Sequence, residues 1–258
     1  MKKAKKSIAL LIAVVMMLAL TACGSIKELA SIKNMGMTEV ARNDGDSFVG
    51  NILGDYVAAD VGDIIEFGTY EQNNDTSNGK EPIEWQVLER DGNKILVISK
   101  FALDVQPYNA ESENVTWETC TLRTWLNETF LNEAFSEAEQ STIQAAEVSP
   151  DKNPDYSTDP GNATKDKIFL LSINEANKYF ASDEARMCIP TAYAIANGAL
   201  TYDGVDGEDN CWWWLRSPGF NRLYAALVYY DSGLNSGGSA VRDGSTGVRP
   251  AMWIDLDA

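Results

Sequence analysis

Histidine is missing from this chain of 258 residues. The imidazole side chain is the usual general base near neutral pH, a common metal ligand and a member of serine and cysteine triads. Those kinds of site are therefore excluded in their common forms. The 38 acidic residues form no motif that singles out a carboxylate pair for glycoside hydrolysis. We expect a protein that is not an enzyme and needs no cofactor, and we keep an envelope enzyme acting on carbohydrate or peptide as the alternative.

Cysteine is scarce, with four residues in the chain. They are Cys23, Cys120, Cys188 and Cys211. No two of them have the Cys-x-x-Cys spacing, which argues against a zinc or other metal site. Two interpretations of the last three stay open. One disulfide with a free partner suits a protein outside the cytoplasm, and three small buried thiols suit an ordinary core.

Basic residues are few, with 21 Lys and Arg against 38 Asp and Glu, and the formal net charge is −17. Partners that need basic patches, such as nucleic acid and anionic membrane surfaces, are disfavoured. The acidic stretch containing Asp203, Asp206, Glu208 and Asp209 could ligate calcium, but its spacing fits no defined calcium loop. A solvated acidic turn is the simpler interpretation.

Residues 220–246 lack five residue types altogether: Lys, Glu, Gln, Met and Trp, which supply 50 of the 258 residues of the chain. Of these 27 residues, 13 are Tyr, Ser, Gly or Asn, the types that dominate antibody loops. The missing types are those that adenine-adenine-pyrimidine codons do not reach when their adenines are replaced, as in retroelement mutagenesis. The alternative is a Gly/Ser-rich surface hairpin of no special origin.

The N-terminus has the pattern of a lipoprotein signal. Four lysines precede the apolar run Ile8–Leu20, which ends in Leu20-Thr21-Ala22-Cys23. This pattern predicts a signal peptide over residues 1–22 and a lipid on Cys23, which would hold the protein on the outer face of a bacterial cytoplasmic membrane. Removal of the four lysines moves the net charge from −17 to −21. An ordinary signal peptide with a chance cysteine is the alternative.

The remaining chain divides into a flexible tether over residues 23–60, polar and with little periodicity, and one folded domain over residues 61–258. Strands are expected over 63–70, 83–90, 94–99 and 167–171, with a hairpin turn at 91–93. Helices are expected over 119–134, 136–145, 172–180 and 190–197, the third with a capping box formed by Ser172 and Glu175. Residues 149–166 and the acidic stretch 203–210 are expected to be loops.

Two apolar segments flank residues 220–246, and we expect strands over 212–215 and 248–254 at the centre of the domain, with Trp253 buried. The side chains of Trp212, Trp213 and Trp214 could form a sugar platform, but strand alternation predicts that at least one of them is core. Arg216 and Arg249 are expected to make structural hydrogen bonds, with a role in ligand binding as the alternative.

Several motifs together resemble the bacterial domain-of-unknown-function family 6273. They are Asp63–Tyr70 with Ile83–Arg90, Thr121–Asn127, Lys167–Ser172, Pro190–Ala194, Trp213–Gly219 and Gly247–Ala251. The resemblance implies one α+β domain of the C-type-lectin-like kind, with mixed or antiparallel strands and two or three helices. That fold is shared by formylglycine-generating-enzyme-like proteins and by retroelement-diversified binding proteins, in which a variable stretch lies near the C-terminus.

Two departures limit what the resemblance implies. The calcium and sugar motifs of true C-type lectins, Glu-Pro-Asn or Gln-Pro-Asp, are replaced here by Glu81-Pro82-Ile83 and Gln106-Pro107-Tyr108. The copper-binding cysteine pair of the formylglycine-generating enzymes has no counterpart, because residues 220–257 contain no cysteine. Neither lectin nor oxidase activity is implied.

We therefore expect a surface-anchored binding protein that contacts a protein or glycan at a cell surface, touches membrane through its lipid alone and binds no nucleic acid. A structural envelope lipoprotein is a further alternative. We predict that the binding residues are polar or aromatic residues of 220–246, because this segment lies between two core segments that can hold it in place. They are Asn221, Arg222, Tyr224, Tyr229, Tyr230, Asp231, Asn235, Ser236, Ser239, Arg242, Asp243 and Ser245.

Overall fold

The structure is a computed structural model that describes residues 56–203 and 208–258. The predicted signal peptide, Cys23 and residues 23–55 of the predicted tether lie outside these residues. The folded part is α+β with mostly antiparallel sheets, as predicted. Within the described ranges, no helix is long and apolar enough to cross a membrane.

Residues 56–60, assigned to the tether by the sequence, contact the domain. The guanidinium of Arg90 donates hydrogen bonds to the carbonyls of Ala59 at 2.7 Å and Val57 at 2.8 Å. The side chain of Ala59 is buried. These last residues of the predicted tether therefore pack on the edge of the first sheet.

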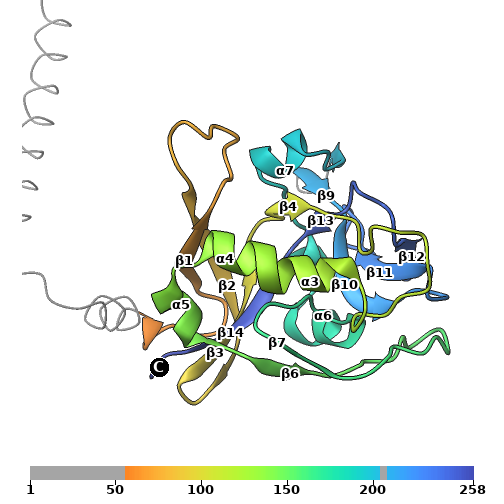
Figure 1. Cartoon of the computed structure of the whole chain (residues 1–258), viewed down its shortest axis with the longest axis horizontal. Coiled ribbons are helices and arrows are strands. Elements are labelled where there is room, and N and C mark those ends of the chain that lie inside the picture. The colour runs from red at the N-terminus through yellow and green to blue at the C-terminus, as the bar shows by residue number, and fades with distance from the viewer. Residues whose placement is uncertain (1–55, 204–207) are drawn as a thin grey trace, which may run out of the picture. The chain divides into compact units, whose positions relative to one another are not determined.

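The first sheet has five antiparallel strands in the order β1-β2-β3-β14-β5 (Figure 1). The strands are β1 (Ile64–Tyr70), β2 (Glu81–Asp91), β3 (Lys94–Ser99), β5 (Ile143–Gln144) and β14 (Ala251–Asp255). β2 and β3 form the predicted hairpin, and Gly92 in its turn has a φ of 58°. Glycine adopts this left-handed conformation without steric cost, so the Asp-Gly-Asn signal in the sequence correctly placed the turn.

The second sheet has five strands in the order β12-β11-β10-β13-β4, and it lies beside the first (Figure 1). Its strands are β4 (Asp104–Val105), β10 (Trp213–Pro218), β11 (Tyr224–Val228), β12 (Leu234–Ala240) and β13 (Gly247–Val248). β10 and β13 are parallel, and the other neighbours are antiparallel. β10 is the central strand, as predicted for 212–215.

Two short hairpins complete the strands. β6 (Ala146–Val148) pairs with β7 (Thr164–Asp166), so residues 149–163 form a long loop between paired strands. The last three residues of the predicted loop 149–166 belong to β7. β8 (Thr201–Asp203) pairs with β9 (Asp209–Cys211), so the predicted acidic loop 203–210 begins and ends in strands. Its residues 204–207 lie outside the described residues.

About four helical segments occur among the described residues, more than the two or three implied by the family resemblance. The longest is continuous from α3 (Thr121–Trp125) through the π-helical turn η1 (Leu126–Phe130) to α4 (Leu131–Ala134), and it crosses in front of the sheets (Figure 1). The others are α5 (Glu137–Thr142), α6 (Ile173–Tyr179) and α7 (Ala192–Ala196), with the 3-10 turn η2 (Glu184–Arg186). The capping box of Ser172 and Glu175 is confirmed at the start of α6.

The predicted strand over residues 167–171 is wrong in type, although the segment is buried. Phe169 makes an isolated bridge with Ala251, and no ladder continues from it. The amide groups of Lys167 and Ile168 instead donate to the side-chain oxygen of Asn127, at 2.9 and 3.1 Å. Because a side chain satisfies these buried donors, the segment needs no neighbouring strand.

The predicted strand over residues 248–254 is two strands in two sheets. β13 ends at Val248 and β14 begins at Ala251, so Arg249-Pro250 carries the chain from the second sheet to the first. Proline has no amide hydrogen for a strand ladder, which explains the break. Trp253 is half-buried, whereas its neighbours Met252 and Ile254 are fully buried.

The tryptophans of β10 form the centre of the core. Trp213 and Trp214 are both inaccessible to solvent, and their indole N–H groups donate to the carbonyls of Arg186 at 2.9 Å and Gln106 at 3.0 Å. The ring of Tyr108 packs edge-on against Trp214 at 5.7 Å between centroids. Adjacent residues are buried on both faces of β10, so this strand lies inside the domain rather than on a half-exposed sheet.

Arg216 follows these tryptophans on β10 and is also buried, with 3 % of its side chain exposed. Its guanidinium donates to both carboxylate oxygens of Glu175, with 2.9 Å between Nη2 and Oε1, and to the carbonyl of Leu170 at 2.9 Å. Glu175 simultaneously accepts the amide of Ser172 in the capping box. One carboxylate therefore caps α6 and neutralises the buried cation of β10, which confirms the predicted structural role of Arg216.

This pair generates a stability prediction. Glu175→Gln keeps a capping-box side chain but removes the bidentate counter-ion of Arg216 and leaves only the carboxylate of Asp151, 3.6 Å from Nη2. It should lower the free energy of unfolding by about 2 kcal/mol. The matched control is Glu139→Gln in the capping box of α5, where no buried arginine is involved. That change should cost less than about 0.5 kcal/mol. Equal losses for the two variants in denaturant unfolding would show that the ion pair is unimportant.

Candidate functional site

Residues 220–246 form the hairpin of β11 and β12, and the two strands differ in burial. Ala225, Ala226, Leu227 and Val228 of β11 are inaccessible to solvent, whereas β12 is the edge strand and its residues are half-buried or exposed. The segment is therefore not one long loop. It is a hairpin, the form expected for the alternative of a Gly/Ser-rich surface hairpin. Its buried strand fixes the position of an accessible one.

Glycines allow the two strands to approach closely at an irregular point of the register. Gly238 has a φ of 83°, and a Cβ atom there would lie 2.3 Å from the carbonyl oxygen of Ala225. At Gly219 a Cβ atom would lie 2.4 Å from the carbonyl oxygen of Gly237. Larger residues at these two positions would force the backbone apart, so the shape of β12 depends on them.

None of the twelve predicted binding residues is buried. Asp231 and Arg242 are exposed, and the other ten are half-buried. The register pairs Val228 with Leu234 at the turn and Tyr224 with Ala240 at the open end. The twelve residues therefore divide between the two ends of the hairpin, with Ser236 and Ser239 along β12 between them.

At the turn, two of the predicted tyrosines join an aromatic cluster that the sequence did not reveal. Tyr230 stacks on Tyr202 of β8 with 4.6 Å between ring centroids, and Tyr229 meets Trp212 edge-on at 4.9 Å. Trp212 also stacks on Tyr202 at 5.9 Å. The side chain of Asn235 donates to the Tyr229 hydroxyl at 2.6 Å. This cluster holds Tyr229 and Tyr230 in fixed orientations next to exposed Asp231.

At the open end, Asp243 organises the turn that follows β12. Its carboxylate accepts from the hydroxyls of Ser239 at 3.0 Å and Ser245 at 2.7 Å, and from the amide of Ser245 at 2.9 Å. These three predicted residues thus bind one another, and they shape the turn that presents exposed Arg242.

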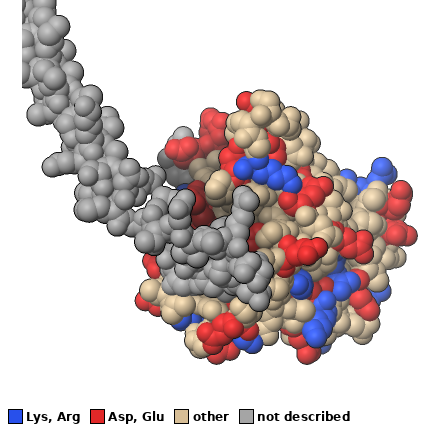
Figure 2. All heavy atoms as spheres, turned by 60° about the vertical axis from the view of Figure 1, so that its left-hand side comes forward, with Lys and Arg blue, Asp and Glu red and all other residues tan. Residues whose placement is uncertain are grey.

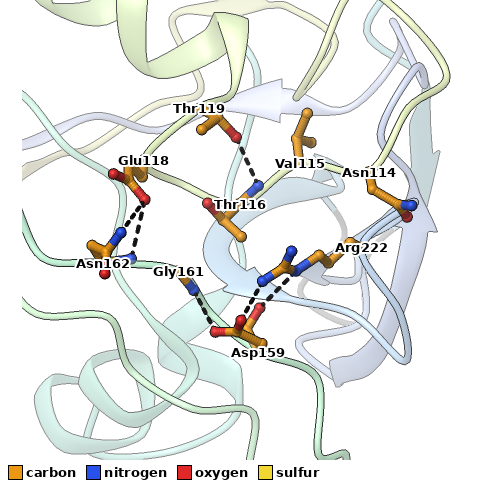
Figure 3. Close-up of a pocket in the computed structure, with 9 residues that line it drawn as sticks. All are labelled: Asn114, Val115, Thr116, Glu118, Thr119, Asp159, Gly161, Asn162 and Arg222. Carbon is orange, nitrogen blue, oxygen red and sulfur yellow. Dashed lines mark hydrogen bonds and ion pairs between the residues drawn. The ribbon is translucent and has the colours of Figure 1, made fainter.

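The start of the segment lines a polar groove with the predicted loop 149–166. Arg222 and Asp159 point toward each other and form an ion pair between the two segments (Figure 3). A hollow of about 340 Å³ lies beside this pair, with Asn114 at one side and the hydrogen-bonded Glu118 and Asn162 at the other (Figure 3). A second hollow of about 490 Å³ shares Asn114, Asp159 and Arg222. We call these adjoining hollows the Arg222 groove.

Aromatic rings border the Arg222 groove. Tyr156 and Phe220 have 42 % and 46 % of their surface exposed, and their centroids lie 6.3 Å apart. Phe220 in turn packs on Tyr224 at 4.3 Å. Of the predicted residues, Asn221 and Arg222 therefore line this groove, and Tyr224 supports its border through Phe220. Tyr156 and Asp159 are additions from the loop.

The loop is held against the hairpin by a buried amide. The side chain of Asn153 donates to the carbonyls of Pro218 and Ser236, both at 2.7 Å. Farther along, the amide of Gly161 donates to the carboxylate of Asp159 at 3.0 Å in a turn where Gly161 has a φ of 85°. The Asp-Pro-Gly sequence signals this turn, but its position beside Arg222 follows only from the tertiary structure.

The other candidates from the sequence do not form sites. The proposed platform of three tryptophans is wrong, because Trp213 and Trp214 are core and Trp212 alone is partly accessible. Arg249 is buried and donates to the carbonyl of Ser99 at 2.8 Å. Within the described part of the chain, no three His, Cys, Asp or Glu residues gather as metal ligands, and Asp206 lies outside that part. Acidic side chains are spread over the visible face (Figure 2).

One buried acid is part of the scaffold. Asp104 of β4 accepts a hydrogen bond from the Tyr70 hydroxyl at 2.8 Å and contacts the amide of Asn197 at 3.4 Å. Burial raises the pKa of Asp104, although these hydrogen bonds oppose the shift, and burial also raises the pKa of Tyr70. The pair joins the two sheets and lines none of the hollows described above, so we assign it a structural role.

Comparison with known proteins gives one match. The model of the family described as "Domain of unknown function (DUF6273)" matches residues 92–256. No curated protein and no solved structure matches the chain. The matched region contains β10, β13, β14 and the whole β11–β12 hairpin. Because this region is well over half of the chain, the protein belongs to the DUF6273 family.

Proposed function

We propose that this chain is a lipoprotein displayed on the outer face of a bacterial cytoplasmic membrane, and that the β11–β12 hairpin binds a protein or glycan at a cell surface. The observation that carries the proposal is the contrast within the hairpin. β11 is fully buried from Ala225 to Val228, whereas none of the twelve predicted residues is buried. A rigid buried strand can hold a surface whose side chains change without loss of the fold.

The domain has the C-type-lectin-like arrangement in this proposal. Support comes from its mixed second sheet and from the position of the hairpin close to the C-terminus. The absence of five residue types from 220–246 supports diversification by a retroelement. Because Ala225–Val228 are buried, diversified residues would be tolerated only outside these four positions. A second copy of codons 220–246 in the genome that differs from the gene at adenines would be the template of the retroelement.

Charge narrows the class of partner. The chain has 38 acidic and 21 basic residues, so long-range electrostatics oppose nucleic acid and anionic lipid surfaces. In this proposal the protein touches membrane through the lipid on Cys23 alone. Tyr and Arg are the residue types that most often carry binding energy in protein interfaces. Tyr229 and Tyr230 at the turn and exposed Arg242 at the open end are therefore the strongest candidates.

The binding surface is tested by alanine substitution of Tyr229, Tyr230 and Arg242, with capture of purified envelope or host-surface proteins and glycans by the immobilised domain. Each change should weaken binding by about 2 kcal/mol. Arg242→Ala should leave the melting temperature unchanged, whereas loss of the ring contacts of Tyr229 or Tyr230 should lower it, but less than Leu227→Ala does. Leu227→Ala is the contrasting variant, because removal of a buried leucine should cost about 2–5 kcal/mol of stability. Wild-type binding by all three surface variants, or melting temperatures as low as that of Leu227→Ala, would refute the proposed surface.

The anchor is tested by Cys23→Ala in the exported full chain. Without the thiol that receives the diacyl group, the protein should move from the membrane fraction to the soluble fraction, since two acyl chains supply stable attachment. Cys120→Ala, which leaves Cys23 in place, should remain with the membranes. A Cys23→Ala protein that fractionates like the wild type would contradict the lipid assignment.

A further inference from the structure

The Arg222 groove is extended rather than deep. Its two hollows, of about 340 and 490 Å³, share Asn114, Asp159 and Arg222. A third hollow of about 340 Å³ continues along the loop from Asp159 past Tyr156 to Lys152. Such a row of shallow hollows suits a chain of small repeating units better than one compact molecule.

The polar groups of the groove suit a ligand rich in hydroxyls. Asn114, Asn162, Asp159, Glu118 and Arg222 present amide, carboxylate and guanidinium groups around the first hollow (Figure 3). A hydroxyl both donates and accepts hydrogen bonds, so it can pair with each of these groups. A large apolar side chain of a peptide would instead displace water from these polar groups without replacing its hydrogen bonds, which costs binding energy.

The rings at the border supply the apolar half of the contact. Tyr156 and Phe220 are among the most exposed large side chains of the described residues. Their ring faces can pack on the C–H face of a pyranose, while the hydroxyls of the sugar reach the polar groups of the groove. Glu118 and Asp159 outnumber Arg222 in the first hollow, and the acidic chain repels anions.

We propose that the Arg222 groove binds a neutral oligosaccharide, with Tyr156 and Phe220 as stacking rings and Asn114, Asp159 and Arg222 as hydrogen-bonding groups. This inference rests on the proposed binding function and names its ligand class at one end of the hairpin. It assigns a binding role to Tyr156 and Asp159, which lie outside residues 220–246.

The test uses the intact domain, from residue 23 onward, against immobilised oligosaccharides of neutral hexoses and N-acetylhexosamines, with carboxylated and phosphorylated glycans as the comparison. The wild type should bind neutral glycans, and Tyr156→Ala should raise the dissociation constant about tenfold or more with an unchanged melting temperature. Tyr156→Phe should retain binding because the ring remains. Ile195→Ala, which alters an exposed side chain on α7, should bind like the wild type.

The outcomes separate this inference from the function on which it rests. If the domain captures a protein ligand through Tyr229 and Tyr230 but binds no neutral glycan, the inference fails and the proposed function stands. Binding of acidic glycans in preference to neutral ones would also overturn it. If no protein and no glycan is bound, both proposals fail together.

A second, independent observation concerns two buried cysteines. Cys188 and Cys211 have 2 % and 0 % of their surface exposed, and the amide of Cys211 donates to the carbonyl of Cys188 at 2.9 Å. The Cys188 thiol is directed to the carbonyls of Lys100 at 3.8 Å and Ile189 at 3.7 Å. Cys120 lies elsewhere, with its thiol directed to the carbonyl of Trp117 at 3.5 Å. Both thiols of the pair are free in this structure.

A cation lies near this pair. The guanidinium of Arg249 packs over the rings of Phe180 and Trp213, at 5.2 and 5.1 Å from their centroids, and its Nη1 atom is buried without a hydrogen-bond partner. Burial would raise the pKa of the Cys188 thiol, but the neighbouring Cys211 side chain and the charge of Arg249 lower it.

We infer that Cys188 and Cys211 become linked by a disulfide when the chain folds outside the cytoplasm, with a disulfide-bearing thiol oxidoreductase as oxidant. The Cys188 thiolate attacks the oxidant's disulfide and releases one of its sulfurs as a thiolate. Deprotonated Cys211 then attacks the mixed disulfide and releases the second sulfur. The two cysteines lose two protons and two electrons, and the oxidant's disulfide becomes two thiols. Because both cysteines are buried afterwards, the reaction precedes their burial.

The test is a peptide map of the exported protein under denaturing, non-reducing conditions. A Cys188–Cys211 peptide pair should be present, two hydrogen atoms lighter than the reduced peptides, while Cys120 reacts with a thiol reagent. The exported Cys120→Ser variant should give the same linked pair. Labelling of both Cys188 and Cys211 without prior reduction would overturn the inference. The wild-type protein alone can give this result, so it does not depend on whether a cysteine variant folds.

Discussion

The bidentate ion pair between Arg216 and Glu175 is the interaction on which the arrangement of the domain depends. Arg216 follows two buried tryptophans on the central strand, so its charge has no access to water. A buried guanidinium requires a fixed counter-ion. Glu175 supplies it from the first turn of α6 and caps that helix at the same time. The position of α6 relative to the second sheet is therefore set by charge as well as by apolar contact.

A second buried arginine joins the two sheets. Arg249 lies where the chain leaves β13 for β14, and its guanidinium is enclosed by Phe180 and Trp213 while it donates to Ser99 of β3. The family motifs around Trp213–Gly219 and Gly247–Ala251 thus contain the two cations that organise the core. Their roles are structural, so the residues between these two motifs are the candidates for function.

Those residues combine rigidity with accessibility. β11 is enclosed between β10 and β12, so its backbone position is fixed, whereas β12 is an edge strand with accessible side chains. Asn153 ties the long loop to the end of β10 and to β12 through the carbonyls of Pro218 and Ser236. The loop and the hairpin therefore form one continuous surface around Arg222, although Arg222 and Asp159 are 63 residues apart in the chain.

Local signals in the sequence were sufficient for local structure. The Asp-Gly-Asn turn between β2 and β3 and the capping box of Ser172 and Glu175 depend on neighbouring residues, so the sequence alone determined them. Residues 167–171 were mistaken for a strand, and residues 248–254 for one continuous strand, because apolar character reports burial but does not identify a hydrogen-bonding partner. The side chain of Asn127 and the break at Pro250 decided those segments. Likewise, the sequence predicted accessible residues in 221–245, but only the tertiary structure divided them between two ends of a hairpin and added Tyr156 and Asp159, because long-range contacts have no local signal.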